Sequence, residues 1–156
     1  MSVCELPSNR VSSAQPAGSR VMRFRPAADG SEPFIWQGVP VTDYKSPAAS
    51  HYGVSRAVLA GETGERTAFQ LRYFEVAPGG NTTLERHTHE HVVFVLRGQG
   101  EVRLGETVHP LSFGDAVYVA PNEVHQLRNT AAQEPFGFLC IVDTIRDRPV
   151  EVAPSA

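Results

Sequence analysis

Short segments in which apolar and polar residues alternate run through the middle of this chain. Residues 67–76 mix aromatic and β-branched side chains with polar ones, and a period of two is typical of a β-strand with one buried face. Residues 92–96 form a shorter, continuously apolar run. Similar segments are residues 101–104, 107–111, 116–120, 125–128 and 136–142. The pattern predicts strands almost throughout, and only residues 55–60 fit a strand or a short helix equally well.

Glycine and proline separate these segments at regular intervals. Pro78-Gly79-Gly80 is expected to end the first strand, and Gly105-Glu106 suits a hairpin turn. Many short strands joined by such turns predict an all-β fold, a sandwich or a barrel. We expect a flexible N-terminal arm at residues 1–20, a single β-barrel domain at 21–145 and a C-terminal tail at 146–156. The two end segments lack any periodicity.

Composition narrows the classes of function. The chain has 156 residues, of which 41% are hydrophobic and 20% charged, with a formal net charge of −3. Mixed signs and a low net charge argue against nucleic acid or a membrane surface as partner, and no apolar run reaches the ~20 residues of a membrane span. Cys4 and Cys140 lie far apart, and the N-terminus lacks the apolar core of a secretory signal. We therefore expect a cytoplasmic protein without a disulfide framework.

Histidines gather in one short stretch. Three of the six lie within five residues, at 87, 89 and 91, and His125 begins a later apolar segment. Imidazole and carboxylate groups bind first-row divalent metals, so this clustering predicts a metal site. In an extended strand, residues of equal parity point to one face. That rule groups Glu85 with His87, and it equally groups His87, His89 and His91. Two ligand sets therefore stay open, each completed by His125.

The spacing of these residues resembles the two motifs of the cupin superfamily. The first motif reads Gly-x5-His-x-His-x3/4-Glu-x6-Gly, and the second reads Gly-x5-Pro-x-Gly-x2-His-x3-Asn. The matching positions are Gly79, Glu85, His87, His91 and Gly98 for the first motif, and Gly114, His125 and Asn129 for the second. The resemblance covers residues 67–142, with the motifs at 79–129. It implies a jelly-roll β-barrel (a double-stranded β-helix) like that of small single-domain bacterial metal-binding cupins.

This chain departs from the motifs at several positions. Glu85 stands where the family has its first histidine, and His91 stands where it has glutamate. Ala120 and Asn122 replace proline and glycine, although asparagine tolerates the left-handed backbone that glycine would supply. The ligand count implied by the resemblance is unchanged, with three nitrogens and one carboxylate oxygen, from Glu85, His87, His91 and His125. In this register His89 lies at the rim of the pocket.

The resemblance also implies a chemistry. One divalent transition metal (Fe, Mn, Ni, Cu, Co or Zn) would bind and polarise the oxygens of a small substrate. We expect a metal-dependent enzyme acting on a small oxygenated organic molecule, with dioxygenase chemistry favoured by analogy. Glu85 and His89 are the candidate proton-transfer residues. The alternatives are an isomerase or lyase that needs no oxygen, and a non-catalytic metal- or small-molecule-binding barrel. A homodimer is expected because small cupins usually pair.

Three further residues could lie near the metal, and the sequence favours another place for each of them. Cys140 lies within an apolar segment and is expected to be a buried small hydrophobe rather than a thiol facing the metal. Arg72 and Arg97 could bind a substrate carboxylate, but we expect them on the solvated exterior of the barrel.

Overall fold

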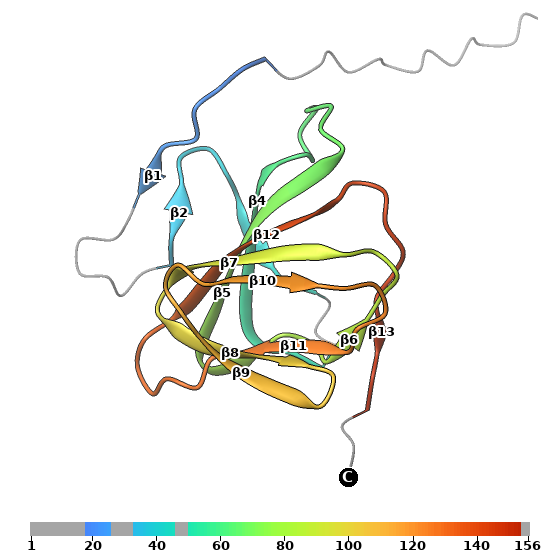
Figure 1. Ribbon diagram of the computed structural model, residues 1–156. Helices are drawn as coiled ribbons and strands as arrows, with labels where there is room; N and C mark the ends of the chain where they lie inside the picture. Colours follow the sequence, from blue (N-terminus) through green and yellow to red (C-terminus); the bar gives the residue numbers. More distant parts are fainter. Residues whose placement is uncertain (1–17, 26–32, 46–49, 154–156) are drawn as a thin grey trace, which may run out of the picture.

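The computed structural model describes residues 18–25, 33–45 and 50–153, which are built from strands and loops without any helix (Figure 1). Most of the predicted N-terminal arm, residues 1–17, lies outside the described part. In the described residues there is accordingly no helix that could cross a membrane. The strands are β1 (Phe24–Arg25), β2 (Ile35–Trp36), β3 (Val41–Asp43), β4 (Tyr52–Ala60), β5 (Phe69–Asn81), β6 (Glu85–Arg86), β7 (His91–Arg97), β8 (Gln99–Leu104), β9 (Thr107–Ser112), β10 (Ala116–Val119), β11 (His125–Arg128), β12 (Phe136–Asp143) and β13 (Val150–Glu151).

The long strand β5 joins two antiparallel sheets into a curled barrel. Over most of its length β5 pairs with β4 on one side and β12 on the other, within the order β3-β4-β5-β12-β7-β10. At its end, Asn81 pairs with Arg128 of β11, which belongs to the second sheet, β13-β6-β11-β8-β9. The two sheets face each other across the core (Figure 1). The all-β barrel expected from the sequence pattern is therefore confirmed.

The inner faces of both sheets supply the core. Its members come from alternate positions of most strands of the barrel, as a two-residue period requires. They are Val54, Phe74, Val76, Val93, Val95, Val102, Leu111, Val117, Val119, Leu127, Phe136, Phe138, Cys140 and Val142. The valines predominate because β-branched side chains pack well on a pleated surface.

Two strand predictions needed correction or resolution. The predicted stop at Pro78-Gly79-Gly80 was wrong, because β5 continues to Asn81, which pairs with both Tyr52 and Arg128. Gly79 makes the continuation possible by adopting a φ of 72°, a left-handed value that a glycine reaches without strain. The ambiguous segment 55–60 is a strand, because β3 and β5 flank it on both sides.

Arg97 is buried, so its predicted place on the solvated exterior was wrong. Its Nη1 lies 2.9 Å from Oε2 of Glu75, and the Tyr73 hydroxyl donates to the same oxygen at 2.6 Å. The cause is a cover that the strand pattern did not reveal: Phe34 and Trp36 of the β1–β2 region pack on Tyr73 at ring-centroid distances of 5.9 and 5.0 Å. The outer face of β5 is thus a second, smaller core.

The C-terminal segment runs back along the barrel. Val150 of β13 pairs with Arg86 of β6, and the Val152 amide donates to the Leu84 carbonyl at 2.9 Å. Figure 1 shows this red segment descending beside β6. Residues 144–151 therefore lie against the loop in which the histidines gather.

Candidate metal centre

His87 sits in a tight turn rather than in a strand. The chain leaves β6 at Arg86 and bends at Thr88 and His89 before β7 begins at His91. Asp147 closes this bend, because its carboxylate accepts the Thr88 amide at 2.8 Å and the His89 amide at 3.0 Å. The bend interrupts the two-residue alternation, so equal parity does not place these side chains on one face.

A second turn brings His125 to the same place. Asn122 adopts a φ of 64°, and its amide donates to the carbonyl of His87 at 2.7 Å. This is the left-handed backbone for which the family motif uses glycine. Three residues later His125 begins β11, where it lies opposite Glu85 in the strand register. One backbone hydrogen bond thus ties the two motifs together.

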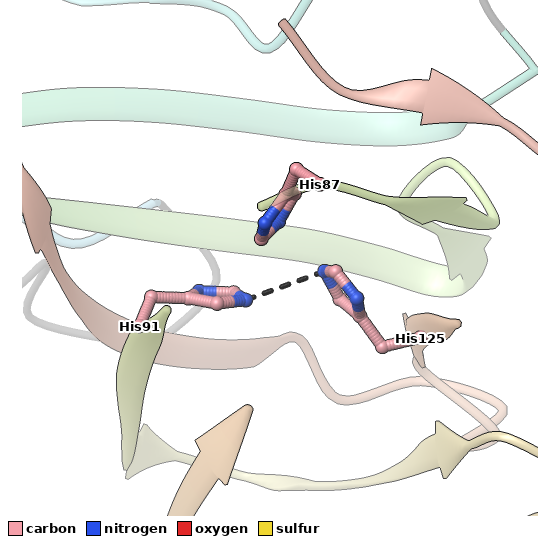
Figure 2. Close-up of side chains that lie close together, drawn as sticks. All are labelled: His87, His91 and His125. Atoms are coloured by element: carbon pink, nitrogen blue, oxygen red, sulfur yellow. Dashed lines mark hydrogen bonds between the residues drawn. The ribbon is translucent and has the colours of Figure 1, made fainter. Parts of the chain in front are cut away.

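Three histidines converge inside the barrel. One ligand nitrogen each from His87, His91 and His125 lies within 4.8 Å of the other two, and all three residues are buried. Nε2 of His91 and Nε2 of His125 are only 3.3 Å apart. Figure 2 shows the three rings approaching one point, His87 and His91 from the segment before and at the start of β7 and His125 from β11.

The outer nitrogens of these rings are already engaged. Nδ1–H of His87 donates to the His89 carbonyl at 2.7 Å, and Nδ1–H of His125 donates to the Glu123 carbonyl at 2.9 Å. Nδ1 of His91 lies 3.2 Å from Sγ of Cys140. A carbonyl can only accept, so at least two Nε2 atoms carry lone pairs. Lone pairs turned toward one point fit a metal cation, since metal-bound imidazoles typically donate through their other nitrogen.

Burial keeps the three imidazoles neutral. Desolvation and the neighbouring histidine charges lower the pKa of His87 to about 4 and that of His91 to about 2. Desolvation also lowers the pKa of His125. The neutral ring is the metal-binding form. The three buried histidines could therefore hold one divalent ion, and their nitrogens would suit Fe, Mn, Ni, Cu, Co or Zn alike.

Glu85 is buried beside the three histidines but faces other partners. Its carboxylate forms an ion pair with Nζ of Lys45, and Oε1 lies 3.4 Å from the Tyr44 hydroxyl. Desolvation, followed by the Glu85 charge, raises the pKa of Tyr44, so this phenol stays protonated. The assignment of Glu85 as fourth ligand remains a prediction, which would require exchange of Lys45 for the metal.

His89 lies behind the other histidines. Its Nδ1 is 2.7 Å from Oδ1 of Asp147, and its ring stacks on that of His87 at 3.6 Å with an interplanar angle of 5°. His89 is not one of the three residues whose nitrogens converge. It holds the His87 ring from behind, while its candidate role in proton transfer is untested.

The histidines open onto a cavity of about 190 Å³. Its wall includes residues that the sequence pattern placed outside the site or did not indicate at all. They are Tyr44, Lys45, Arg56, Arg72, Arg146 and Cys140. Cys140 is both a core residue and a cavity thiol, because it lies opposite Arg72 in the strand register. Arg72 faces this cavity and not the solvated exterior, which corrects the sequence-based expectation. The alternation of β5 could not have revealed this, because apolar residues occupy both parities, with Phe69 and Tyr73 on one and Phe74 on the other.

Comparison with known proteins agrees with the fold and the motifs. The Cupin domain family model (Cupin_2) matches residues 72–142. A relative from Rhodospirillum rubrum, named 1-methylthio-D-xylulose 5-phosphate methylsulfurylase, is 39% identical over 80% of this chain and 79% of its own length. The chain therefore belongs to the cupin family, and its fold is the cupin jelly-roll barrel.

Solved structures give the same result. A crystal structure of a cupin-2 domain from Rhodospirillum rubrum superposes with a TM-score of 0.73 and 39% identity, covering 83% of this chain and 84% of that one. A cupin 2 domain-containing protein from Halorhodospira halophila is 44% identical, with a TM-score of 0.63 and 86% coverage of both chains. Among the relatives, the Rhodospirillum rubrum protein carries the name of an enzyme, a methylsulfurylase.

Proposed function

We propose that this protein is a metal-dependent enzyme acting on a small oxygenated organic substrate. The observation that carries the proposal is the convergence of three buried, neutral histidines on the floor of a cavity. A bound divalent ion would act there as a Lewis acid on substrate oxygens. Three protein ligands would leave coordination positions for those oxygens, as in catalytic rather than structural sites.

The surrounding residues orient the substrate and control its protons. Lys45 and Tyr44 hold the Glu85 carboxylate in place, and we propose that Glu85 exchanges a proton with a bound substrate. Phe74 and Phe138 line the apolar part of the cavity and exclude solvent, which strengthens every electrostatic interaction inside it.

Chemistry that needs no oxygen is favoured over the dioxygenase that the sequence suggested. The relative at 39% identity is named for action on a methylthio-substituted sugar phosphate, a compound that carries hydroxyl and carbonyl oxygens suited to a metal. We propose isomerase- or lyase-type chemistry on a substrate of this class. The dioxygenase alternative keeps the same metal and the same histidines.

The test compares turnover with and without oxygen. Protein loaded with Mn(II) or Fe(II) is incubated with 1-methylthio-D-xylulose 5-phosphate and other ketose phosphates, and substrate loss is followed by NMR. Anaerobic turnover that disappears in His125→Ala supports the proposal. Oxygen uptake with a diketone or catechol, together with no anaerobic turnover on any ketose phosphate, would reject it in favour of an oxygenase.

We also propose a homodimer in the cytoplasm. Val92, Phe94 and Tyr118 are exposed side by side on β7 and β10, and Ile141 lies next to Val92 on β12. A contiguous exposed apolar surface of this kind is typically buried against a partner protein. A second copy of the chain is the simplest such partner.

A further inference from the structure

Three arginines line the metal cavity, and each comes from a different segment. Arg56 lies on β4, Arg72 on β5, and Arg146 in the segment between β12 and β13. In the β4–β5 register, Arg56 pairs with Phe74 and Val58 pairs with Arg72. Arg56 and Arg72 are therefore diagonal neighbours on the same inner face of the sheet.

These cations have no carboxylate partner among the residues that the structure describes. The Nε–H groups of Arg56 and Arg72 are buried and lack any hydrogen-bond partner there. A buried donor without a partner is costly, and native proteins rarely leave one unless something else satisfies it. Arg97, by comparison, is buried against Glu75. The contrast indicates that Arg56 and Arg72 are satisfied by something that enters the cavity, which Arg146 also lines.

We propose that Arg56, Arg72 and Arg146 form the binding site for a phosphate group of the substrate. This inference rests on the proposed function, because it places the phosphate at one end of a molecule whose oxygens reach the histidines. The guanidinium group offers a planar fork of donors that matches phosphate geometry. Three positive charges without described carboxylate partners suit a dianion better than a carboxylate monoanion.

Neutral groups hold two of the arginines in place. The Arg72 guanidinium lies over the Phe74 ring at 5.2 Å, and its Nη2 is 3.2 Å from Sγ of Cys140. Arg146 donates to Oε1 of Gln70 and to the Asp143 carbonyl, both at 2.9 Å. None of these contacts neutralises the charge, so the full charge is available to a ligand. Such preorganisation reduces the entropic cost of binding.

The mutual repulsion of the arginines points the same way. Burial, followed by the charges of Arg72 and Arg56, lowers the pKa of Arg146, although Glu62 nearby acts in the opposite direction. The three guanidinium groups are thus close enough to repel one another electrostatically. A dianion bound between them would offset that repulsion.

The distance from the arginines to the histidines suits a small molecule. Sγ of Cys140 lies 3.2 Å from Arg72 and also 3.2 Å from Nδ1 of His91. The Cys140 side chain alone therefore separates Arg72 from His91. A phosphorylated compound of a few carbons can contact both, with its phosphate on the arginines and its hydroxyl or carbonyl oxygens toward the histidines.

The experiment uses inorganic phosphate as the probe, so that it needs no turnover. Phosphate affinity is measured by calorimetry on the full chain as wild type, Arg72→Gln, Arg146→Gln and the control Arg66→Gln. Arg66 is exposed and does not line the cavity. Each cavity variant is expected to weaken phosphate binding roughly tenfold or more, since hydrogen bonds to charged groups are strong. The control should bind as wild type does. Arg146 is exposed, so its variant tests the site even where Arg72→Gln fails to fold.

The metal and the phosphate can be separated. His125→Ala is expected to lose metal and keep phosphate binding, while the arginine variants keep metal and lose phosphate. Unchanged phosphate affinity in both arginine variants would overturn the inference, as would acetate binding as tightly as phosphate. Arginine-dependent phosphate binding in a wild-type protein that takes up no divalent metal would uphold the inference and reject the proposed function.

Discussion

Nε2 of His91 and Nε2 of His125 lie 3.3 Å apart, although 34 positions separate the two residues in the sequence. Each histidine is the first residue of its strand, β7 and β11. Strand ends are places where the ladder stops constraining the backbone, so a side chain can turn into the barrel. The proximity thus follows from the turns that precede the two strands, above all the one at Asn122.

Replacing His125 with alanine should empty the metal site. His125→Ala removes one of three converging nitrogens, whereas His109→Ala removes an exposed ring on β9. At metal concentrations a hundred times the Kd, bound metal stabilises a protein by about 2.7 kcal/mol. Wild type and His109→Ala should show this gain in thermal unfolding, and His125→Ala should not. Equal metal content in both variants by elemental analysis would contradict the assignment.

Glu85 can be tested as fourth ligand by its effect on cobalt spectra. In Glu85→Gln, the visible bands of bound Co(II) should change in intensity only if the carboxylate belongs to the coordination shell. Lys45→Met frees the carboxylate from its ion pair and should strengthen its coordination. Co(II) spectra that are identical in wild type and both variants would show that Glu85 acts only through Lys45 and Tyr44.

The metal-free protein should lose stability as the pH falls from about 6.5 to about 4. In the unfolded chain a histidine takes up its proton near 6.5, whereas the pKa of His87 is lowered to about 4 and that of His91 to about 2 in the folded state. The unfolded state then binds more protons, and protons favour it as the pH drops. Melting curves of chelator-treated protein should show this fall. His91→Ala should fall less steeply over the same range, and parallel curves would refute the explanation.

The buried ion pair between Arg97 and Glu75 should be sensitive to loss of one partner. Arg97→Met leaves the Glu75 carboxylate buried next to Tyr73, which should cost roughly 3 to 5 kcal/mol in the free energy of unfolding. The matched control is Arg128→Met on β11, whose pair with Glu101 is more exposed and should cost at most about 1 kcal/mol. Denaturant unfolding measures both. Equal losses would mean that the Glu75 carboxylate is solvated.

The proposed homodimer predicts a specific weak point. Phe94→Glu introduces a charge into the exposed apolar surface of β7 and should yield monomers in light scattering after gel filtration. Val108→Glu is the control, because Val108 is at least as exposed as Phe94 but lies on β9, away from that surface. A monomeric wild type would contradict the proposed homodimer. A Phe94→Glu variant that remains dimeric would show that the dimer interface does not include this surface.

The sequence was sufficient for strands β7 to β12 and for the three converging histidines, because both are encoded locally, but it did not predict β1, β2, β3, β6 or β13. Alternation and glycine placement predict β7 to β12 to within a residue or two at each end. Motif spacing indicated His87, His91 and His125. Parity failed for His89, because the bend that Asp147 closes depends on a residue 58 positions away. The ion pair of Lys45 with Glu85 and the cover over Arg97 likewise depend on segments that show no periodicity of their own.

The residues from 144 to 149 complete the cavity wall without belonging to the barrel ladders. Arg146 and Pro149 line the cavity from this segment, which a few hydrogen bonds from Thr144, Arg146 and Asp147 hold in place. Asp147 closes the bend beside His87, but substitutions at the other positions of this segment should leave the strand registers and the three histidines in place. Variants at Arg146 or Pro149 should therefore alter the shape and charge of the cavity wall without moving the three histidines beneath it.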